Sequence, residues 1–199
     1  MAATDNPLKR LVTTFIEDFA EWVLGTQVAG VTSRNIELYA DTIRSDQIFL
    51  VKLIDKRTVI LHLEFQGRRT DKPMSLRELD YLSRLTQTYR DMELYSVVFY
   101  VGQGAGRHDT GSHQVKSPTG DITLSWKYKV IRLWEMDAEE IWALDRTTFL
   151  PLIGQTQIEN PDEMLPKVVE KIKGIQDNEQ QKRLLTELKA LMDDEEVYA

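Results

Sequence analysis

The sequence predicts an α/β domain over residues 1–152, followed by a helical C-terminal extension over residues 153–199. Of the 199 residues, 42% are hydrophobic, which is enough to build a proper core. Short runs rich in β-branched and aromatic residues, bounded by turn residues, indicate strands. Segments with helical apolar spacing stand before, between and after those runs, so helices and strands are interspersed along the chain.

The first element is predicted to be a helix over residues 8–24, with Gly25 as a stop signal. Its apolar positions recur at the spacing of one helical face: Leu11, Phe15, Phe19, Trp22 and Val23. Residues 30–34 are then expected to form a turn that leads into the first strand.

Three strands are predicted next, over residues 36–44, 46–54 and 58–66, because these segments are rich in β-branched and aromatic side chains. The polar residues 55–57 predict a short turn that makes the second and third strands a hairpin.

A second helix is predicted over residues 73–92, where Pro73 is a favoured first-turn residue. One face carries apolar side chains in steps of three and four: Leu79, Leu82, Leu85, Tyr89 and Met92. The other face carries Arg77, Tyr81 and Arg84.

The remainder is predicted to contain a buried strand at 95–101, a loop or long hairpin at 102–120 and one more strand at 122–134. Capping signals at Asn160 and Asp177 predict two amphipathic helices, of which the last covers residues 178–192. Residues 193–199 are expected to form a frayed acidic tail.

The composition favours a cytoplasmic protein. The chain has no cysteine, which excludes disulfides, thiolate zinc sites and a cysteine nucleophile, and it shows no export signal or membrane-spanning segment. Its net charge of −7 argues against a nucleic-acid partner at face value. The distribution of charge along the chain weakens this argument. Residues 43–90 hold ten basic against six acidic residues (+4), whereas residues 134–199 hold seven basic against sixteen acidic residues (−9).

The third predicted strand contains the main candidate for chemistry. Side-chain alternation places Leu61, Leu63 and Phe65 on one face and His62, Glu64 and Gln66 on the other. Glu64 lies near the end of this strand, and Asp46 opens the neighbouring one, so a hairpin would bring the two carboxylates together. Converging carboxylates with a backbone carbonyl suit Mg²⁺. The alternative is that both acids are solvated at strand ends or pair with Arg44 and Arg77.

The order and spacing of several motifs resemble a known family. The motifs are Arg44-x-Asp46, Leu-His-Leu-Glu64-Phe-Gln66, Met74-x-x-Arg77-x-x-x-Tyr81 and Val130-Ile-Arg-Leu-Trp134. Over about residues 6–152 the chain resembles the Rpn-type recombination-promoting nuclease and transposase-like families of the PD-(D/E)XK superfamily. The resemblance implies a restriction-endonuclease-like α-β-β-β-α-β core with a mixed sheet, and a link to recombination or mobile elements.

The resemblance also implies roles for single residues. Asp46 and Glu64 would bind Mg²⁺ or Mn²⁺ with the carbonyl of Phe65, and Gln66 would stand where most relatives of the superfamily have lysine. Ser45 replaces the proline of the superfamily's name. A neutral glutamine can orient water or phosphate by hydrogen bonds but cannot neutralise developing charge.

Further residues are candidates for DNA contact. Arg77 and Tyr81 lie one helical turn apart and can face a scissile phosphate, or Arg77 pairs with a nearby acid while Tyr81 packs on the sheet. Arg68 and Arg69, with Lys72, form a basic patch beyond the strand that suits a DNA backbone, or a solvated loop.

Three further features of the sequence give weaker signals of a functional site. Helix-one acids (Glu17, Asp18, Glu21) are candidates for an extra catalytic carboxylate, or only for a solvated face. Residues 102–106 lack the glycine spacing of a nucleotide loop. His108 and His113 are expected to lie too far from any acid cluster to form a metal site.

We therefore expect a Mg²⁺-dependent DNA endonuclease. The rival is a catalytically inactive nuclease-fold module that binds DNA or protein, which the glutamine at position 66 and the acidic C-terminal half favour. Either form is compatible with a homo-oligomer assembled through the C-terminal amphipathic helices.

Overall fold

The computed structural model describes residues 5–33, 47–67 and 72–192, with side chains from residue 7 onward. The chain forms an α/β fold around a mixed five-stranded sheet with the order β1-β2-β3-β4-β7. The sheet strands are β1 (Val28–Ser33), β2 (Gln47–Leu53), β3 (Thr58–Gln66), β4 (Glu93–Tyr100) and β7 (Lys129–Arg132). β1, β2 and β3 are antiparallel neighbours, whereas β4 runs parallel to both β3 and β7.

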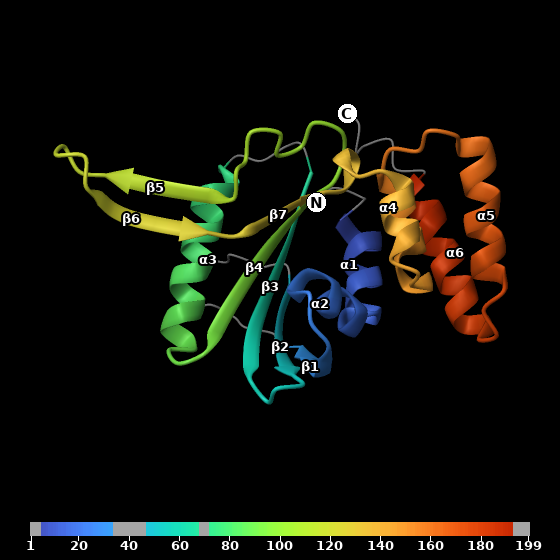
Figure 1. Ribbon diagram of the computed structural model, residues 1–199, viewed down its shortest axis with the longest axis horizontal. Helices are drawn as coiled ribbons and strands as arrows, with labels where there is room; N and C mark the ends of the chain where they lie inside the picture. The colour runs from blue at the N-terminus through green and yellow to red at the C-terminus, as the bar shows by residue number, and fades with distance from the viewer. Residues whose placement is uncertain (1–4, 34–46, 68–71, 193–199) are drawn as a thin grey trace.

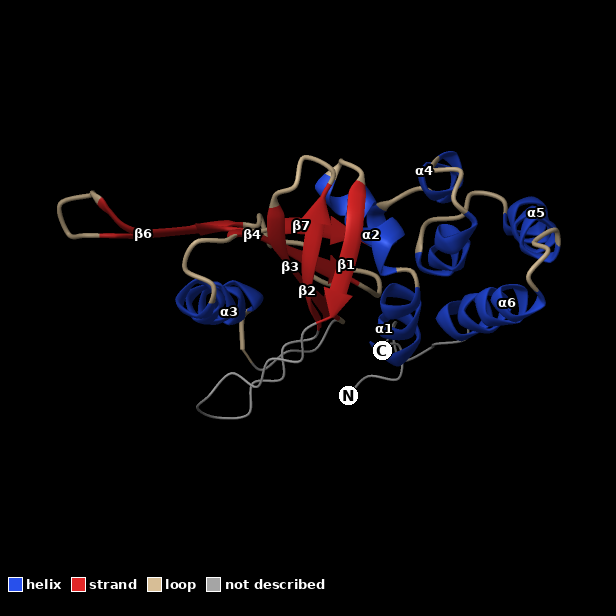
Figure 2. Ribbon diagram, turned by 90° about the horizontal axis from the view of Figure 1, so that it is seen from below, coloured by secondary structure: helices blue, strands red, loops and turns tan. Residues whose placement is uncertain are grey.

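Helices cover both faces of this sheet (Figure 2). One face is packed against α3 (Met74–Thr88). The opposite face is packed against α1 (Asp5–Thr14) and α2 (Ile16–Leu24), and beyond them lie the C-terminal helices. These are α4 (Ala138–Ala143), α5 (Pro161–Lys173) and α6 (Asn178–Met192), with the 3₁₀ segments η1 (Leu133–Glu135) and η2 (Thr147–Gln155).

Two strands stand apart from the sheet. β5 (Ser112–Lys116) and β6 (Ile122–Lys127) form a two-stranded hairpin that projects away from the body beside α3 (Figure 1). The predicted loop or long hairpin at 102–120 thus supplies the first strand of this hairpin. The single strand predicted at 122–134 is divided into β6 and β7 by Tyr128, whose N–H donates to the carbonyl of Gly111 (2.9 Å).

Most other predicted elements are confirmed, with three corrections. The helix predicted over residues 8–24 is broken at Phe15, which has non-helical backbone angles (φ −117°, ψ 37°). The turn predicted at 30–34 was wrong for its described part, because Gly30 lies within β1 and its Cα pairs with that of Lys52. The helix predicted to reach residue 92 ends at Thr88. The predicted strand at 36–44 and the acidic tail lie outside the described residues.

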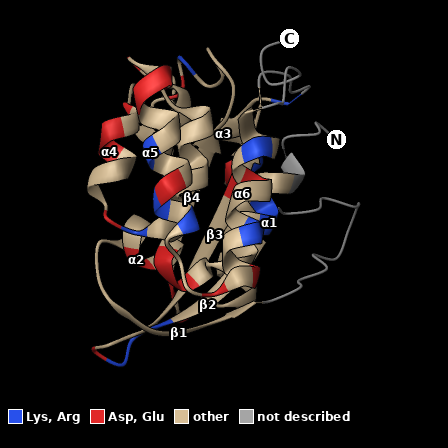
Figure 3. Cartoon of the chain, turned by 90° about the vertical axis from the view of Figure 1, so that its right-hand side faces the viewer, with Lys and Arg blue, Asp and Glu red and all other residues tan. Residues whose placement is uncertain are grey.

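The C-terminal helices share the main core with the sheet. Leu184, Leu188 and Leu191 of α6 are buried in the same apolar cluster as Leu61 and Leu63 of β3. The apolar side of α6 is therefore buried within its own chain and is not free to form the interface between copies that the sequence predicts. The predicted boundary at 152/153 falls inside η2. Figure 3 shows acidic and basic positions interspersed over these helices.

No helix among the described residues combines the length and the apolar character needed to cross a membrane.

Candidate functional site

The candidate site is built on the α3 side of the central strand β3. Both faces of this strand are buried, but only one is apolar. Leu61, Leu63 and Phe65 belong to the main core, while His62, Glu64 and Gln66 point towards α3 and have exposed fractions of 0%, 0% and 6%. The alternation predicted from the sequence is confirmed. The polar face is covered by a helix instead of solvent, so its polar groups need partners within the protein.

Arg77 is the cation that pairs with this polar face. Its Nη2 donates to Glu64 Oε1, and its Nη1 donates to Gln66 Oε1 at 2.6 Å. The amide nitrogen of Gln66 in turn donates to the carbonyl of Gly67 at 2.9 Å. The Glu64 side chain is fully buried, whereas that of Arg77 is 25% exposed. Arg77 thus neutralises a buried carboxylate while part of its guanidinium reaches solvent.

A second group of polar side chains continues the site towards β4. The hydroxyl of Ser96 donates to Glu78 Oε2 at 2.6 Å and lies 2.8 Å from Nδ1 of His62. Because the single hydroxyl proton of Ser96 is used on Glu78, Nδ1 of a neutral His62 must be the donor to Ser96. His62 Nε2 and Glu78 Oε1 then have no hydrogen-bond partner among the described residues. His62 Nε2 lies 3.9 Å from Glu64 Oε2.

Burial shifts the pKa values of two groups in this site. Desolvation raises the pKa of Glu78 to about 7, although the Ser96 hydrogen bond and Arg77 act in the opposite direction. Desolvation, with a smaller contribution from Arg77, lowers the pKa of His62 to about 3. His62 is therefore neutral in the folded protein at all ordinary pH values. Glu78 therefore changes charge near neutrality.

The face of α3 that meets the sheet differs from the sequence-based expectation. The buried residues are Met74, Glu78, Tyr81 and Leu85. Leu79 and Leu82, which were predicted to form the apolar face, are only partly buried. The physical reason lies in β3, because Glu78 and Tyr81 of α3 lie over the polar part of this strand face and only Leu85 packs on its apolar part, with Ile60.

Tyr81 and Phe65 occupy positions that bear on their predicted roles. Tyr81 is 1% exposed, and its ring centroid lies 4.8 Å from that of His62. This agrees with the alternative in which Tyr81 packs against the sheet. The side chain of Phe65 stacks on Phe99 in the apolar core, with ring centroids 5.4 Å apart.

The structure brings together only part of the predicted site. Glu64, Gln66 and Arg77 form one hydrogen-bonded group, whereas Asp46, Arg68 and Arg69 lie outside the described residues. Within the described residues no group of three or more histidine, aspartate or glutamate side chains is placed to hold a metal ion. Sequence reasoning missed Glu78 and Ser96 as parts of the site. The spacing of Met74, Glu78 and Tyr81 along one helical face was a usable signal for Glu78.

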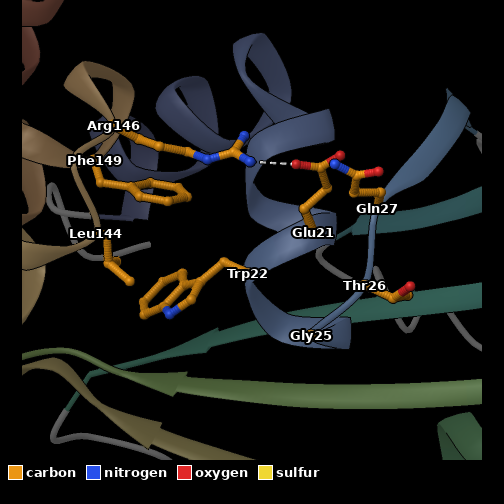
Figure 4. A pocket seen from close by; sticks show the side chains of 8 residues that line it. All are labelled: Glu21, Trp22, Gly25, Thr26, Gln27, Leu144, Arg146 and Phe149. Atoms are coloured by element: carbon orange, nitrogen blue, oxygen red, sulfur yellow. Dashed lines mark hydrogen bonds and ion pairs between the residues drawn. The ribbon is translucent and has the colours of Figure 1, made fainter.

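The helix-one acids lie on the other side of the sheet. Asp18 and Glu21 of α2 both pair with Arg146, and Thr148 donates to Asp18 at 2.6 Å. Glu21 and Arg146 border an open pocket of about 260 Å³, where the ring of Phe149 lies beside the Arg146 side chain (Figure 4). The indole of Trp22 lies on the other side of Phe149, with ring centroids 5.2 Å apart. Apart from Glu21, this pocket contains none of the residues that the sequence predicts for the site. Asp18 and Glu21 are engaged in ion pairs far from Glu64.

Among the described residues His113 contacts a single acid, Asp109. Its Nε2 lies 3.1 Å from Asp109, which also accepts hydrogen bonds from the hydroxyls of Tyr100 (2.5 Å) and Tyr128 (2.8 Å). These bonds and desolvation raise the pKa values of both tyrosines, with desolvation as the larger cause. Asp109 thus anchors the segment between β4 and β5 to the sheet.

Comparisons with protein-family models, with curated proteins and with solved structures find no match.

Proposed function

We propose that the protein is a Mg²⁺-dependent nuclease of the Rpn type, with a restriction-endonuclease-like core, that hydrolyses phosphodiester bonds of DNA in the cytoplasm. The observation that carries the proposal is Glu64, a fully buried carboxylate on the central strand. It lies beside Gln66 and is paired with Arg77, in a chain whose elements begin with two helices, three strands, a helix and a strand, with the strands in a mixed sheet.

The physical argument starts from the cost of burying charge. A carboxylate removed from water is unfavourable even with a good ion pair, and an apolar residue at such a position is often equally stabilising. The neighbouring strand positions Leu61 and Leu63 show that this chain fills β3 with leucine where only packing is needed. A glutamate, a glutamine and a histidine on the other face therefore favour a chemical role.

The donor set of this site fits a hard divalent cation in part. Glu64 supplies a carboxylate, and the carbonyl of Phe65 supplies a second oxygen of the type that Mg²⁺ prefers. The proposed second carboxylate, Asp46, is joined directly to Gln47, whose Cα pairs with that of Leu63, the residue before Glu64. When bound, Mg²⁺ polarises a phosphoryl oxygen and makes water more acidic.

The protein's own side chains would do the remaining work. The Arg77 guanidinium is partly exposed, so it can turn from Glu64 to a phosphate oxygen when a cation neutralises the carboxylate. Gln66 has an amide that can orient water or phosphate, and Tyr81 fixes the position of His62 behind the site. Arg68 and Arg69 follow β3 directly in the sequence and are proposed to contact the DNA backbone.

A specific observation favours a second candidate, the inactive binding module. Arg77 pairs with Glu64, and the neutral Gln66 contacts this same guanidinium. If the buried polar face has only a structural role, an arginine that pairs with Glu64 is all that the fold requires. In that case the protein docks DNA or another protein without cleavage.

The test is cleavage of supercoiled plasmid in Mg²⁺, Mn²⁺ or EDTA by the wild type and by Asp46→Ala and Glu64→Ala. We expect metal-dependent nicking that both substitutions abolish. Asp145→Ala is the matched control, because it removes an exposed carboxylate whose partner is Lys171, far from β3. It should cleave at the wild-type rate.

Calorimetric titration of Mg²⁺ into the same four proteins separates the two candidates. A well-folded wild type that neither binds Mg²⁺ nor nicks plasmid, yet shifts DNA in EDTA, identifies the binding module. Cleavage that persists in both variants would show that Asp46 and Glu64 are not the site.

A further inference from the structure

The loop of residues 101–111, between β4 and β5, lies at the end of the sheet where the candidate site is found (Figure 1). The N–H of Val101 donates to the carbonyl of Gln66 at 3.0 Å, which joins the loop directly to the site strand. In register, Gln66 of β3 pairs with Tyr100 of β4, and Tyr100 pairs with Arg132 of β7. The three parallel strands therefore end in one row, beside which the loop begins. Open α/β sheets bind their ligands at the carboxyl ends of their strands.

Groups on the inner side of this loop hold it in place. Arg132 Nε donates to the carbonyl of Gly106 at 2.9 Å, and its Nη2 donates to the carbonyl of Asp109. The indole of Trp134 donates to the carbonyl of Ala105 at 2.9 Å. Because these contacts fix the main chain, the exposed side chains of the loop are not needed to define its shape.

Arg107 is an exposed cation that this loop displays. Its guanidinium carbon lies 5.9 Å from the centre of the Trp134 ring. Arg107 has no ion pair with a carboxylate among the described residues, in contrast to six other arginines, which are Arg10, Arg57, Arg77, Arg84, Arg132 and Arg146. An arginine on an aromatic ring keeps the N–H groups at its edge available for an anion, and its planar fork matches a phosphate.

The charge of the surrounding segment favours a polyanion. Residues 101–132 hold five basic against two acidic residues (+3), in a chain whose net charge is −7. One of the two acids, Asp109, accepts hydrogen bonds from the hydroxyls of Tyr100 and Tyr128, so its carboxylate is directed towards the sheet. A local excess of basic residues on an acidic protein is the electrostatic feature expected where a nucleic-acid backbone binds.

The position of the Arg107–Trp134 pair relative to Glu64 fits a bound DNA strand. Trp134 belongs to the same buried cluster as Met74 of α3 and Tyr100, so it lies on the α3 side of the sheet, as Glu64 does. β7 is two strands away from β3. Neighbouring strands are about 4.8 Å apart and a DNA strand rises about 3.4 Å per nucleotide, so this separation corresponds to about three nucleotides.

We propose that Arg107, held on the ring of Trp134, binds a backbone phosphate of DNA about three nucleotides from the phosphate at Glu64. This inference deepens the proposed function and rests on it for the identity of the ligand. A phosphate contact supplies affinity and orientation but no sequence information. Arg107 is therefore a substrate-binding residue that acts on DNA of any sequence.

DNA binding by the full chain in EDTA tests the proposal, with fluorescence anisotropy of a short labelled duplex over a salt series. Arg107→Ala should weaken binding about fivefold at low salt and lower the slope of log affinity against log salt by about 1, because one phosphate contact is lost. The loss should be equal for two duplexes of unrelated sequence. Arg107→Lys keeps the charge but not the planar fork, so it should keep the slope and recover only part of the affinity.

Arg90→Ala is the matched control. Arg90 is also exposed and has no ion pair with a carboxylate among the described residues. It precedes β4, whose first residue Glu93 pairs with Val59, at the end of β3 opposite to Gln66. The control removes the same charge far from the site and should leave the affinity and the salt slope nearly unchanged. Equal midpoints of thermal unfolding for the wild type and Arg107→Ala verify that the loop is intact.

Equal losses of affinity in Arg107→Ala and Arg90→Ala would overturn the proposal, because the effect would then be one of net charge alone. A wild type that binds no DNA in EDTA would overturn it as well. The nuclease proposal fails separately. Metal-dependent nicking by a protein whose DNA binding ignores Arg107→Ala removes only this inference. Arg107-dependent DNA binding by a protein that neither binds Mg²⁺ nor nicks plasmid removes only the nuclease.

Discussion

The two faces of β3 are equally buried, but one is apolar and the other carries polar side chains. Comparing them separates the residues that stabilise the fold from those that are candidates for function. On one face Leu61, Leu63 and Phe65 pack into a continuous apolar core. On the other, His62, Glu64 and Gln66 are held by hydrogen bonds to groups of α3 and β4. Burial of the first face is favourable by itself, whereas burial of the second is tolerated only because partners are supplied.

The largest expected effect comes from opening a cavity on the apolar face. Leu61→Ala removes a side chain that is 0% exposed, and it should lower the free energy of unfolding by about 3 kcal/mol. Urea denaturation followed by tryptophan fluorescence measures this. The control is Ile54→Ala at the exposed turn after β2, which should change stability by less than about 0.5 kcal/mol. Similar values for both would show that this face is not tightly packed.

The polar face of β3 should make the free energy of unfolding depend on pH. Glu78 has a pKa of about 7 in the folded protein against an ordinary value of 4.5, so between these values only the folded state holds the proton and stability falls as pH rises. His62 has a pKa of about 3 against an ordinary 6.5, so between these values only the unfolded state holds the proton and stability rises with pH. The two effects oppose each other between pH 4.5 and 6.5.

Glu78→Gln removes one of these opposing contributions. The stability of this variant should rise across that window by up to about 1.4 kcal/mol per pH unit, whereas the wild type stays nearly flat. Denaturation at several pH values measures the slope. If the stability of Glu78→Gln depends on pH as little as that of the wild type, the protonation states assigned to Glu78 and His62 are wrong.

The Glu64–Arg77 ion pair should give a measurable coupling free energy in a double-variant cycle. Glu64→Leu or Arg77→Met leaves one charge without its partner, and each should lower stability by roughly 2 kcal/mol, less than for a fully enclosed pair because Arg77 is 25% exposed. The double variant should lose less than the sum, with a coupling of about 1 kcal/mol. Strict additivity in urea titrations would mean that the pair is not formed.

The smallest expected effect comes from one hydrogen bond made by Tyr100 of β4. Tyr100→Phe deletes only the hydroxyl that donates to Asp109, and it should cost about 1 kcal/mol. In an Asp109→Asn background the carboxylate acceptor has already been removed, so Tyr100→Phe should cause no comparable loss of stability there. Thermal unfolding of the single and double variants checks this.

Elements with strong local signals were predicted well, and those that depend on distant partners were not. β3 and α6 begin and end as predicted, because alternation at period two and a clear capping signal specify them locally. Gly30 suggested a turn, yet it lies in β1 because main-chain pairing with Lys52 needs no side chain. α4 and η2 were not predicted, since α4 packs on η2 and η2 packs on α6, and neither follows a regular local pattern.

The candidate site was predicted unevenly for a similar reason. Alternation alone placed His62, Glu64 and Gln66 on one face, and helical spacing placed Arg77 and Tyr81 together. The inclusion of Glu78 and Ser96 needed the tertiary structure, because Ser96 lies on β4, and the pairing of β4 with β3 is not encoded in either strand.

The sequence by itself determined the strand and helix types, the two-faced pattern of β3 and the cysteine-free composition, because periodicity and residue chemistry act over a few neighbouring residues. Only the tertiary structure decided that a helix covers the polar face, that Arg77 neutralises Glu64, and that the apolar side of α6 is buried in the main core while the β5–β6 hairpin stands apart from the sheet. Those outcomes depend on which surfaces meet, and burial, desolvation and ion pairing act only once they have met.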